Sequence, residues 1–224
     1  MQARMAQNRH TIFQAARGLI AVGGFKEAQM AAIAEQAGVS TGLIYRYFSN
    51  KTQLMVEILN DAVSSEIVIL NDIAKRPETA ESNLHAAVTA FVRRALTGPQ
   101  LAYAFMAEPV DPQVEAERIL CKQRFANVFK EILLAGMNKK EFDIDDVETA
   151  AACVVGAMTE AVISPITPTI PTTHDKHRVA TTIADFCVRA VCHWPLVSTY
   201  SKNKIKRSSM VYRPHDKHHA ACKH

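Results

Sequence analysis

The chain has 224 residues, 48% of them hydrophobic and 21% charged, so we expect a globular protein with a real hydrophobic core. No run approaches the roughly 18 apolar residues that a membrane helix needs, and the first residues lack the apolar region and cleavage site of a secretory signal. These absences predict a cytoplasmic protein with no membrane partner. Five cysteines without a CxxC pair favour free thiols over a disulfide framework.

The net charge of +4 is unevenly distributed along the chain. Residues 1–60 carry six Lys and Arg against three Asp and Glu, a net of +3, and residues 61–200 carry thirteen against eighteen, a net of −5. Residues 201–224 carry seven against one, a net of +6. A basic head and a basic tail on an acidic body indicate that the head, the tail or both meet a polyanion. The alternative for the tail is a solvated, disordered end.

Helical spacing of apolar residues dominates the sequence, and the alternation typical of strands is nearly absent. The pattern predicts a first helix over about 8–22, ended by Gly23-Gly24, and a short second helix over 30–37, ended by Gly38. Ser40 and Asn50 are good N-caps for a third helix and for a longer fourth helix that runs to about residue 74.

Pro77 breaks the pattern, and helices are then expected over 84–95 and 101–107. Asp111-Pro112 predicts the start of a helix that runs to about Ala135 and ends at Gly136. Further helices are expected over about 145–163 and 174–193, separated by a proline-rich loop over 164–173. We therefore predict an all-α chain of about nine helices, with a head over 1–50, a helical body over 51–197 and a basic, disordered tail over 198–224.

The second and third predicted helices are joined by a turn of the kind found in a helix-turn-helix, Ala37-Gly38-Val39-Ser40. The third helix would then be the recognition helix, whose first residues reach base edges in the major groove of DNA. Ile44 and Phe48, four residues apart, would face the core of the head. We expect the DNA contacts to come from Thr41, Gly42, Tyr45, Arg46, Tyr47 and Lys51. For Arg46 a solvated position is as good an interpretation as a contact.

The same stretch, IFQAARGLIAVGGFKEAQMAAIAEQAGVSTGLIYRYFSNKTQLM, resembles the N-terminal domain of the tetracycline-repressor (TetR) family of transcriptional regulators. The resemblance covers about a fifth of the chain, and the rest agrees only in length and helical pattern. It implies a homodimer that binds a palindromic operator in double-stranded DNA. It also implies an effector pocket in the body and release of the DNA when a small-molecule effector binds. It places Thr41, Gly42, Leu43 and Tyr45 at the groove, and Tyr47 and Lys51 on phosphates.

Two features depart from the family pattern at the second helix. Ala28 and Gln29 stand where the family has a capping Thr or Ser, so either Gln29 caps weakly or the helix starts one residue away. Ala31 and Ala32 offer no polar group to DNA, which shifts base readout toward the third helix and a basic N-terminal arm with Arg4 and Arg9.

Aromatic and methionine side chains gather in the central helices of the predicted body. As a set they favour an apolar or aromatic effector, although each of them alone fits plain core equally well or better. The candidate effector-binding residues are Phe91, Tyr103, Phe105, Met106, Phe125 and Phe129. The last two predicted helices carry more apolar surface than a small body can cover, which indicates a partner, although intramolecular core accounts for part of it. The resemblance implies that these helices form the two-fold interface of a homodimer.

No catalytic residue, metal or cofactor is predicted. The sequence contains no G-x-S-x-G, HExxH, P-loop or GxGxxG motif, so an α-helical enzyme has no support. The His-rich tail and the cysteines fit adventitious metal capture and buried apolar packing better than a sensor. We therefore predict a ligand-responsive repressor, and the alternative from another class is a non-specific nucleic-acid binder that uses the basic tail.

Overall fold

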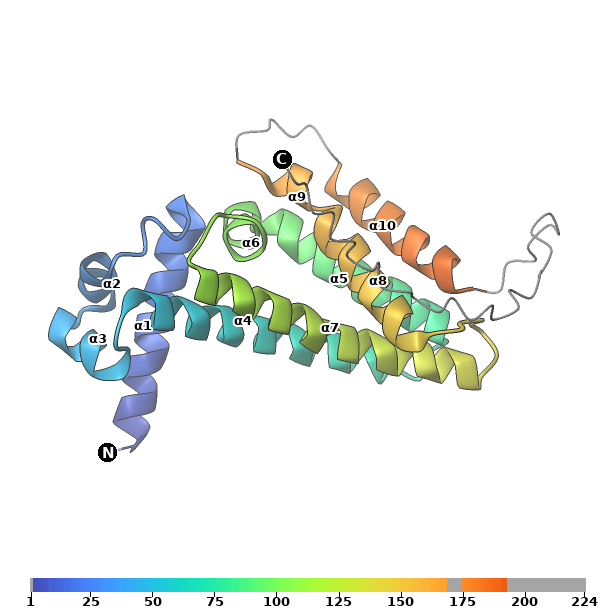
Figure 1. The fold of residues 1–224 in the computed structure, drawn as a ribbon, viewed down its shortest axis with the longest axis horizontal. Coiled ribbons are helices and arrows are strands. Elements are labelled where there is room, and N and C mark those ends of the chain that lie inside the picture. The colour runs from blue at the N-terminus through green and yellow to red at the C-terminus, as the bar shows by residue number, and fades with distance from the viewer. Residues whose placement is uncertain (1, 169–174, 193–224) are drawn as a thin grey trace, which may run out of the picture. The chain divides into compact units, whose positions relative to one another are not determined.

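The computed structural model describes residues 2–168 and 175–192, and these residues form helices joined by short connections, with one isolated bridge between Phe142 and Cys192 (Figure 1). The all-α prediction is therefore confirmed. The predicted tail over 198–224 and residues 169–173 of the proline-rich loop lie outside the described residues.

Three helices form the head: α1 (Gln2–Gly23), α2 (Met30–Ala37) and α3 (Thr41–Tyr47). Their core is mainly aliphatic and also contains the rings of Phe13, Phe25 and Phe48. Its fully buried members are Ile12, Ala16, Ile20, Ala28, Ile33, Ile44 and Phe48. Removing side chains of this kind from water stabilises the head by about 1.5–3 kcal/mol each. α1 begins six residues before the sequence pattern predicts, because its polar first two turns lack an apolar face from which to infer a helix.

Helix α4 (Lys51–Ala74) connects the head to the body. The body consists of α5 (Ala80–Thr97), α6 (Pro99–Met106), α7 (Pro112–Asn138), α8 (Val147–Glu160), the single turn α9 (Ile163–Ile166) and α10 (Lys176–Val191). α5 packs against α10 and α4, and α7 packs against α4 and α8 (Figure 1). The buried residues of head and body form one continuous hydrophobic cluster.

Predicted helix boundaries hold where a cap determines them. Ser40 Oγ accepts a hydrogen bond from Leu43 N at 3.2 Å, and Asn50 Oδ1 accepts one from Gln53 N at 2.8 Å. Asp111 caps α7 in the same way. Thr79, which the sequence analysis did not identify, caps α5, so this helix begins four residues before the predicted start at 84. These caps satisfy backbone donors that have no partner inside the helix.

Gly136 does not end α7, as its position in the sequence suggested. It is buried inside the helix, and a side chain at this position would overlap the ring of Phe142. The left-handed turn that follows the helix is made instead by Lys140, with φ of 61°. Position 136 therefore favours glycine because the Phe142 ring packs against it, not because the backbone there is left-handed.

The segment expected to be a helix to residue 163 and then a loop is also arranged differently. α8 ends at Glu160, and Ile163–Ile166 forms the extra turn α9, which includes Pro165. Val147–Ile166 has the length and apolar composition of a membrane span, where the sequence analysis expected no such run. Its buried residues, among them Val154, Val155 and Met158, belong to the core of the body.

Candidate nucleic-acid interface and internal cavity

The turn between α2 and α3 has the backbone geometry that its sequence predicts. Gly38 adopts the left-handed conformation with φ of 64°, and its N–H donates to the Glu35 carbonyl at 3.1 Å. Val39 N donates to the Ala34 carbonyl at 3.0 Å, and the Val39 side chain packs against the core. Gln29 occupies the N-cap position of α2 but makes no capping bond, because its side chain donates to the Lys26 carbonyl instead.

Helix α3 separates an inner face from an outer face. Ile44 and the following Phe48 are fully buried, whereas Tyr45 is 53% exposed and Arg46 is also exposed. Thr41 and Leu43 are half-buried at its first turn. Gly42 is exposed, and a Cβ at this position would meet no atom within 4 Å. The packing of the chain itself thus gives no reason for a glycine there.

Tyr47 and Lys51 lie at the border between the two faces. The Tyr47 side chain is half-buried against the core, and its hydroxyl accepts a hydrogen bond from Asn8 Nδ2 at 3.3 Å. The hydroxyl proton remains available for an outside acceptor such as a phosphate oxygen. Lys51 begins α4, where burial lowers the pKa of its amino group while the nearby Glu108 carboxylate acts in the opposite direction. A phosphate there would be favoured by the dipole of α4 as well as by the lysine.

The basic residues near the N-terminus do not form an extended arm. Both Arg4 and Arg9 lie in α1. Arg9 forms an ion pair with Glu57 and lies over the rings of Phe13 and Phe48, at 5.2 and 5.3 Å from their centroids. This arginine therefore joins the head to α4, and of the two only Arg4 is exposed without such an engagement among the described residues.

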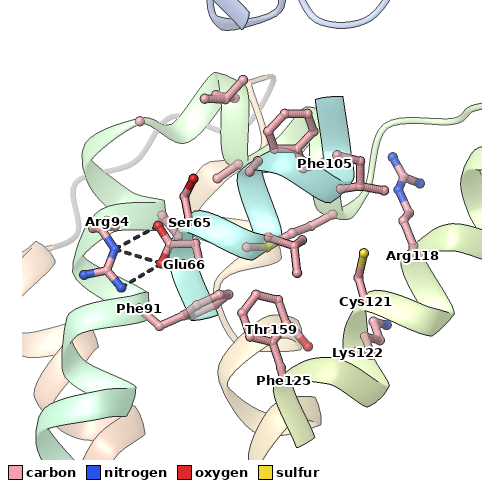
Figure 2. Close-up of a pocket in the computed structure, with 18 of the residues that line it drawn as sticks. Ser65, Glu66, Phe91, Arg94, Phe105, Arg118, Cys121, Lys122, Phe125 and Thr159 are labelled. Carbon is pink, nitrogen blue, oxygen red and sulfur yellow. Dashed lines mark hydrogen bonds and ion pairs between the residues drawn. The ribbon is translucent and has the colours of Figure 1, made fainter. Parts of the chain in front are cut away.

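A cavity of about 220 Å³ lies in the body between α4, α5, α6 and α7, with α8 and α9 closing it (Figure 2). Four of the six candidate effector residues line it: Phe91, Phe105, Met106 and Phe125. Phe91 and Phe125 meet edge to face with ring centroids 5.5 Å apart. Tyr103 packs against the core and Phe129 is fully buried in it, and neither lines the cavity.

Charged side chains also line the cavity, and the sequence analysis did not identify them. Arg94 Nε donates to both carboxylate oxygens of Glu66, at 2.9 and 2.8 Å, on one wall. On the opposite wall, Arg118 and Lys122 stand one turn apart on α7 (Figure 2). Helical spacing could have revealed Arg118, since it shares a face with the buried Val114, Cys121 and Phe125.

The head and the body are connected by polar contacts next to this cavity. Glu108, in the connection after α6, accepts a hydrogen bond from Phe25 N at 3.0 Å, and Gly24 beside it has φ of 80°. The Phe25 ring lies 5.8 Å from the Phe105 ring, which lines the cavity. A change in the cavity at α6 therefore has a direct route to the connection between α1 and α2.

Cys121 and Cys187 are buried free thiols of the body. Burial, together with the nearby Glu117 carboxylate, raises the pKa of Cys121 to about 11, and burial raises that of Cys187 to about 11. Within residues 2–168 and 175–192, no three His, Cys, Asp or Glu side chains gather in a way that could hold a metal ion. The histidines of the tail and Cys222 lie outside the described residues.

Comparison with known proteins agrees with this arrangement. Residues 12–58 match the model of the bacterial regulatory proteins of the tetR family. The chain is 26% identical over 154 residues to the fatty acid metabolism regulator protein of Bacillus subtilis, covering 67% of this chain and 79% of that protein. It is 29% identical over 119 residues to the HTH-type transcriptional repressor KstR of Rhodococcus jostii, covering 50% of this chain and 54% of that one.

Solved structures share the fold over most of the chain. The transcriptional regulator FadR from Bacillus subtilis, in complex with stearoyl-CoA, superposes with a TM-score of 0.70 at 22% identity and covers 80% of this chain and 97% of that one. RolR in complex with resorcinol superposes with a TM-score of 0.65 at 22% identity and covers 85% and 90%. Residues 12–58, which include the helix-turn-helix, therefore match the TetR family of regulatory proteins, and the chain with its helical body shares the fold of these solved structures.

Proposed function

We propose that the chain is a homodimeric repressor that binds a palindromic operator through α3 and leaves it when a small apolar or aromatic effector enters the cavity. The observation that carries this proposal is the outer face of α3. Gly42, Tyr45 and Arg46 are exposed there, and the glycine has no role in the packing of the chain. A surface without a side chain lets the backbone approach DNA closely. Such a regulator works in the cytoplasm, and residues 1–50 form its DNA-binding domain.

The cavity supports an apolar effector. An apolar cavity of about 150 Å³ stays dry and binds benzene, so a cavity of about 220 Å³ has room for a small aromatic or aliphatic molecule. Phe91, Phe105 and Phe125 would supply the apolar contacts. The two solved relatives contain stearoyl-CoA and resorcinol, molecules with a substantial apolar part.

The route from effector to DNA runs through the contacts at the head. α4 and α6 line the cavity, α4 carries the ion pair from Glu57 to Arg9, and the residues after α6 carry Glu108. An effector that displaces α6 or α4 would change the position of each head relative to its partner. Two heads that no longer match successive major grooves lose the operator.

The dimer would form through α8 and α10. Phe186 on α10 is 63% exposed, and Ala190 on the same helix and Cys153 on α8 are also exposed. An exposed aromatic ring among small apolar residues fits a self-complementary interface. Phe186→Asp should convert the protein to a monomer in sedimentation velocity and weaken operator binding.

A gel shift with the DNA upstream of its own gene tests the proposed function. We expect a sequence-specific shift that Arg46→Ala and Lys51→Ala weaken, whereas Arg93→Ala, which removes an exposed arginine from α5, leaves it unchanged. Removing residues 201–224 distinguishes the repressor from the alternative, a non-specific nucleic-acid binder that uses the basic tail. Binding that disappears with the tail and shows no sequence preference would support a non-specific nucleic-acid binder and contradict the repressor.

The same DNA tests whether Glu108 couples the effector cavity to the head. Glu108→Ala removes the acceptor for Phe25 N, so the variant should still bind DNA but should need more effector to release it. Glu131→Ala removes an exposed carboxylate on α7 that lies outside the cavity lining, and it is the matched control.

A further inference from the structure

Arg118 is a buried cation on the wall of the cavity. Its side chain is only 7% exposed, and it projects from α7 on the face that carries Cys121 and Phe125 (Figure 2). A charged side chain in such a position is normally paired and fully hydrogen-bonded, because water no longer solvates it. The partners of its guanidinium therefore show whether the site is complete.

The guanidinium is only partly satisfied by the chain. Nη1 donates to Glu115 Oε2 at 2.7 Å, and Nη2 donates to the carbonyls of Ala104 and Glu108 at 2.6 and 2.8 Å. Nε is buried and donates no hydrogen bond to any of the described residues. A buried donor of a charged group left without an acceptor is costly, which makes an acceptor from outside the chain favourable.

The charges around the cavity favour an anion as this acceptor. Arg94 is bound to Glu66, and Arg17 donates to Asp61 at 3.4 Å, so these arginines are already compensated. Lys122 lines the cavity one turn after Arg118, and among the described residues no carboxylate forms an ion pair with it. Glu115, the one carboxylate bound to Arg118, is largely exposed and faces solvent on its other side. The α7 wall is therefore positive overall, with Glu160 the remaining acidic residue of the lining.

We propose that Arg118 is the polar anchor of the cavity, and that the effector is an amphipathic anion whose apolar body contacts Phe91, Phe105 and Phe125. A carboxylate, sulfonate or phosphate oxygen would accept from Arg118 Nε, with Lys122 adding charge. This inference rests on the proposed function, because it specifies the chemistry of the same cavity. Since Arg118 Nη2 also holds the carbonyl of Glu108, an anion that draws the guanidinium toward the cavity would act on the residue that holds Phe25.

Two dyes of nearly the same shape test the charge requirement directly. Anilinonaphthalene sulfonate and N-phenylnaphthylamine share the same fused and single aromatic rings, and only the former carries a sulfonate. Both become fluorescent in an apolar site, so their affinities for the full-length protein are measured by titration without DNA. Ala102→Trp, which fills the cavity, should abolish the binding of both dyes and thus locate them.

We expect the wild-type protein to bind the sulfonate at least about tenfold more tightly than the neutral dye, since a charged hydrogen bond contributes at this level. Arg118→Met should remove this preference while leaving the affinity for the neutral dye nearly unchanged. Arg118→Lys should retain part of it, and Arg93→Met, at an exposed arginine outside the cavity lining, should retain all of it.

Equal affinity of the wild-type protein for the two dyes would overturn the proposal, and this measurement needs no variant to fold. A sulfonate preference that survives Arg118→Met would overturn it as well. The proposed function fails separately: a protein that prefers the sulfonate through Arg118 but shifts no DNA has the anionic site without being an operator-binding repressor.

Discussion

Replacing Gly42 by alanine should make the protein more stable and a weaker DNA binder at the same time. Gly42 is the second residue of α3 and has no neighbour within 4 Å of the position where a Cβ would lie. The added methyl group therefore meets no obstacle within the protein. Its two effects come from different physical causes, so they can be measured separately.

The gain in stability comes from helix propensity, which favours alanine over glycine by up to about 1 kcal/mol in a helix interior. For a domain of this size that corresponds to a rise in Tm of roughly 2–4 °C. The loss of affinity comes from close approach, because a methyl group inserted into a tightly packed contact costs about 1–3 kcal/mol. Operator affinity should therefore fall by roughly fivefold to 150-fold.

Fluorescence anisotropy with labelled operator DNA, at fixed salt, measures the affinity, and differential scanning calorimetry measures Tm. Asn127→Ala on the exposed side of α7 is the control, because it also improves helix propensity but lies far along the chain from the head. Unchanged or tighter DNA binding by the Gly42→Ala variant would refute the close approach of α3 to DNA.

Three further predictions concern the body and the phosphate contacts. Gly136→Ala should destabilise the protein by about 1–3 kcal/mol in urea unfolding, because the new methyl group overlaps the ring of Phe142; equal stability would mean that this ring moves aside freely. Lys51→Ala should weaken binding to all DNA sequences alike and reduce the salt dependence of log K by about 1, which affinity measured at several salt concentrations checks. Cys121 and Cys187 should resist iodoacetamide near neutral pH and react in urea, as mass spectrometry would show, because a pKa of about 11 leaves the folded thiols protonated; rapid labelling of the folded protein would contradict their burial.

Local sequence signals predict the head well. Gly38 requires a left-handed backbone, Ser40 and Asn50 cap the helices that follow, and the spacing of Ile44 and Phe48 determines which face of α3 is buried. Each of these features depends on a few residues that are neighbours in the chain, so the sequence alone is enough to predict it.

The features that local sequence patterns did not predict depend on tertiary contacts. The buried ring of Phe142 explains Gly136, but Phe142 lies beyond the end of α7 and its packing is not visible in the helical pattern. Helical spacing puts Arg118 on the buried face of α7, but the carbonyl groups that bind it, from Ala104 on α6 and from Glu108 after α6, cannot be read from that spacing. The cavity is formed by residues from α1 and from α4 to α9, so Tyr103 could not be distinguished from Phe105 by composition alone.

A footprint of the upstream DNA would test the central claim, that α3 reads the major groove, most directly. The account predicts protection of a single two-fold symmetric segment, with half-sites about one turn of DNA apart or more, that is lost in the Gly42→Ala and Arg46→Ala variants at matched protein concentration. No protection at any upstream sequence, or even protection along the whole fragment that both variants retain, would contradict it.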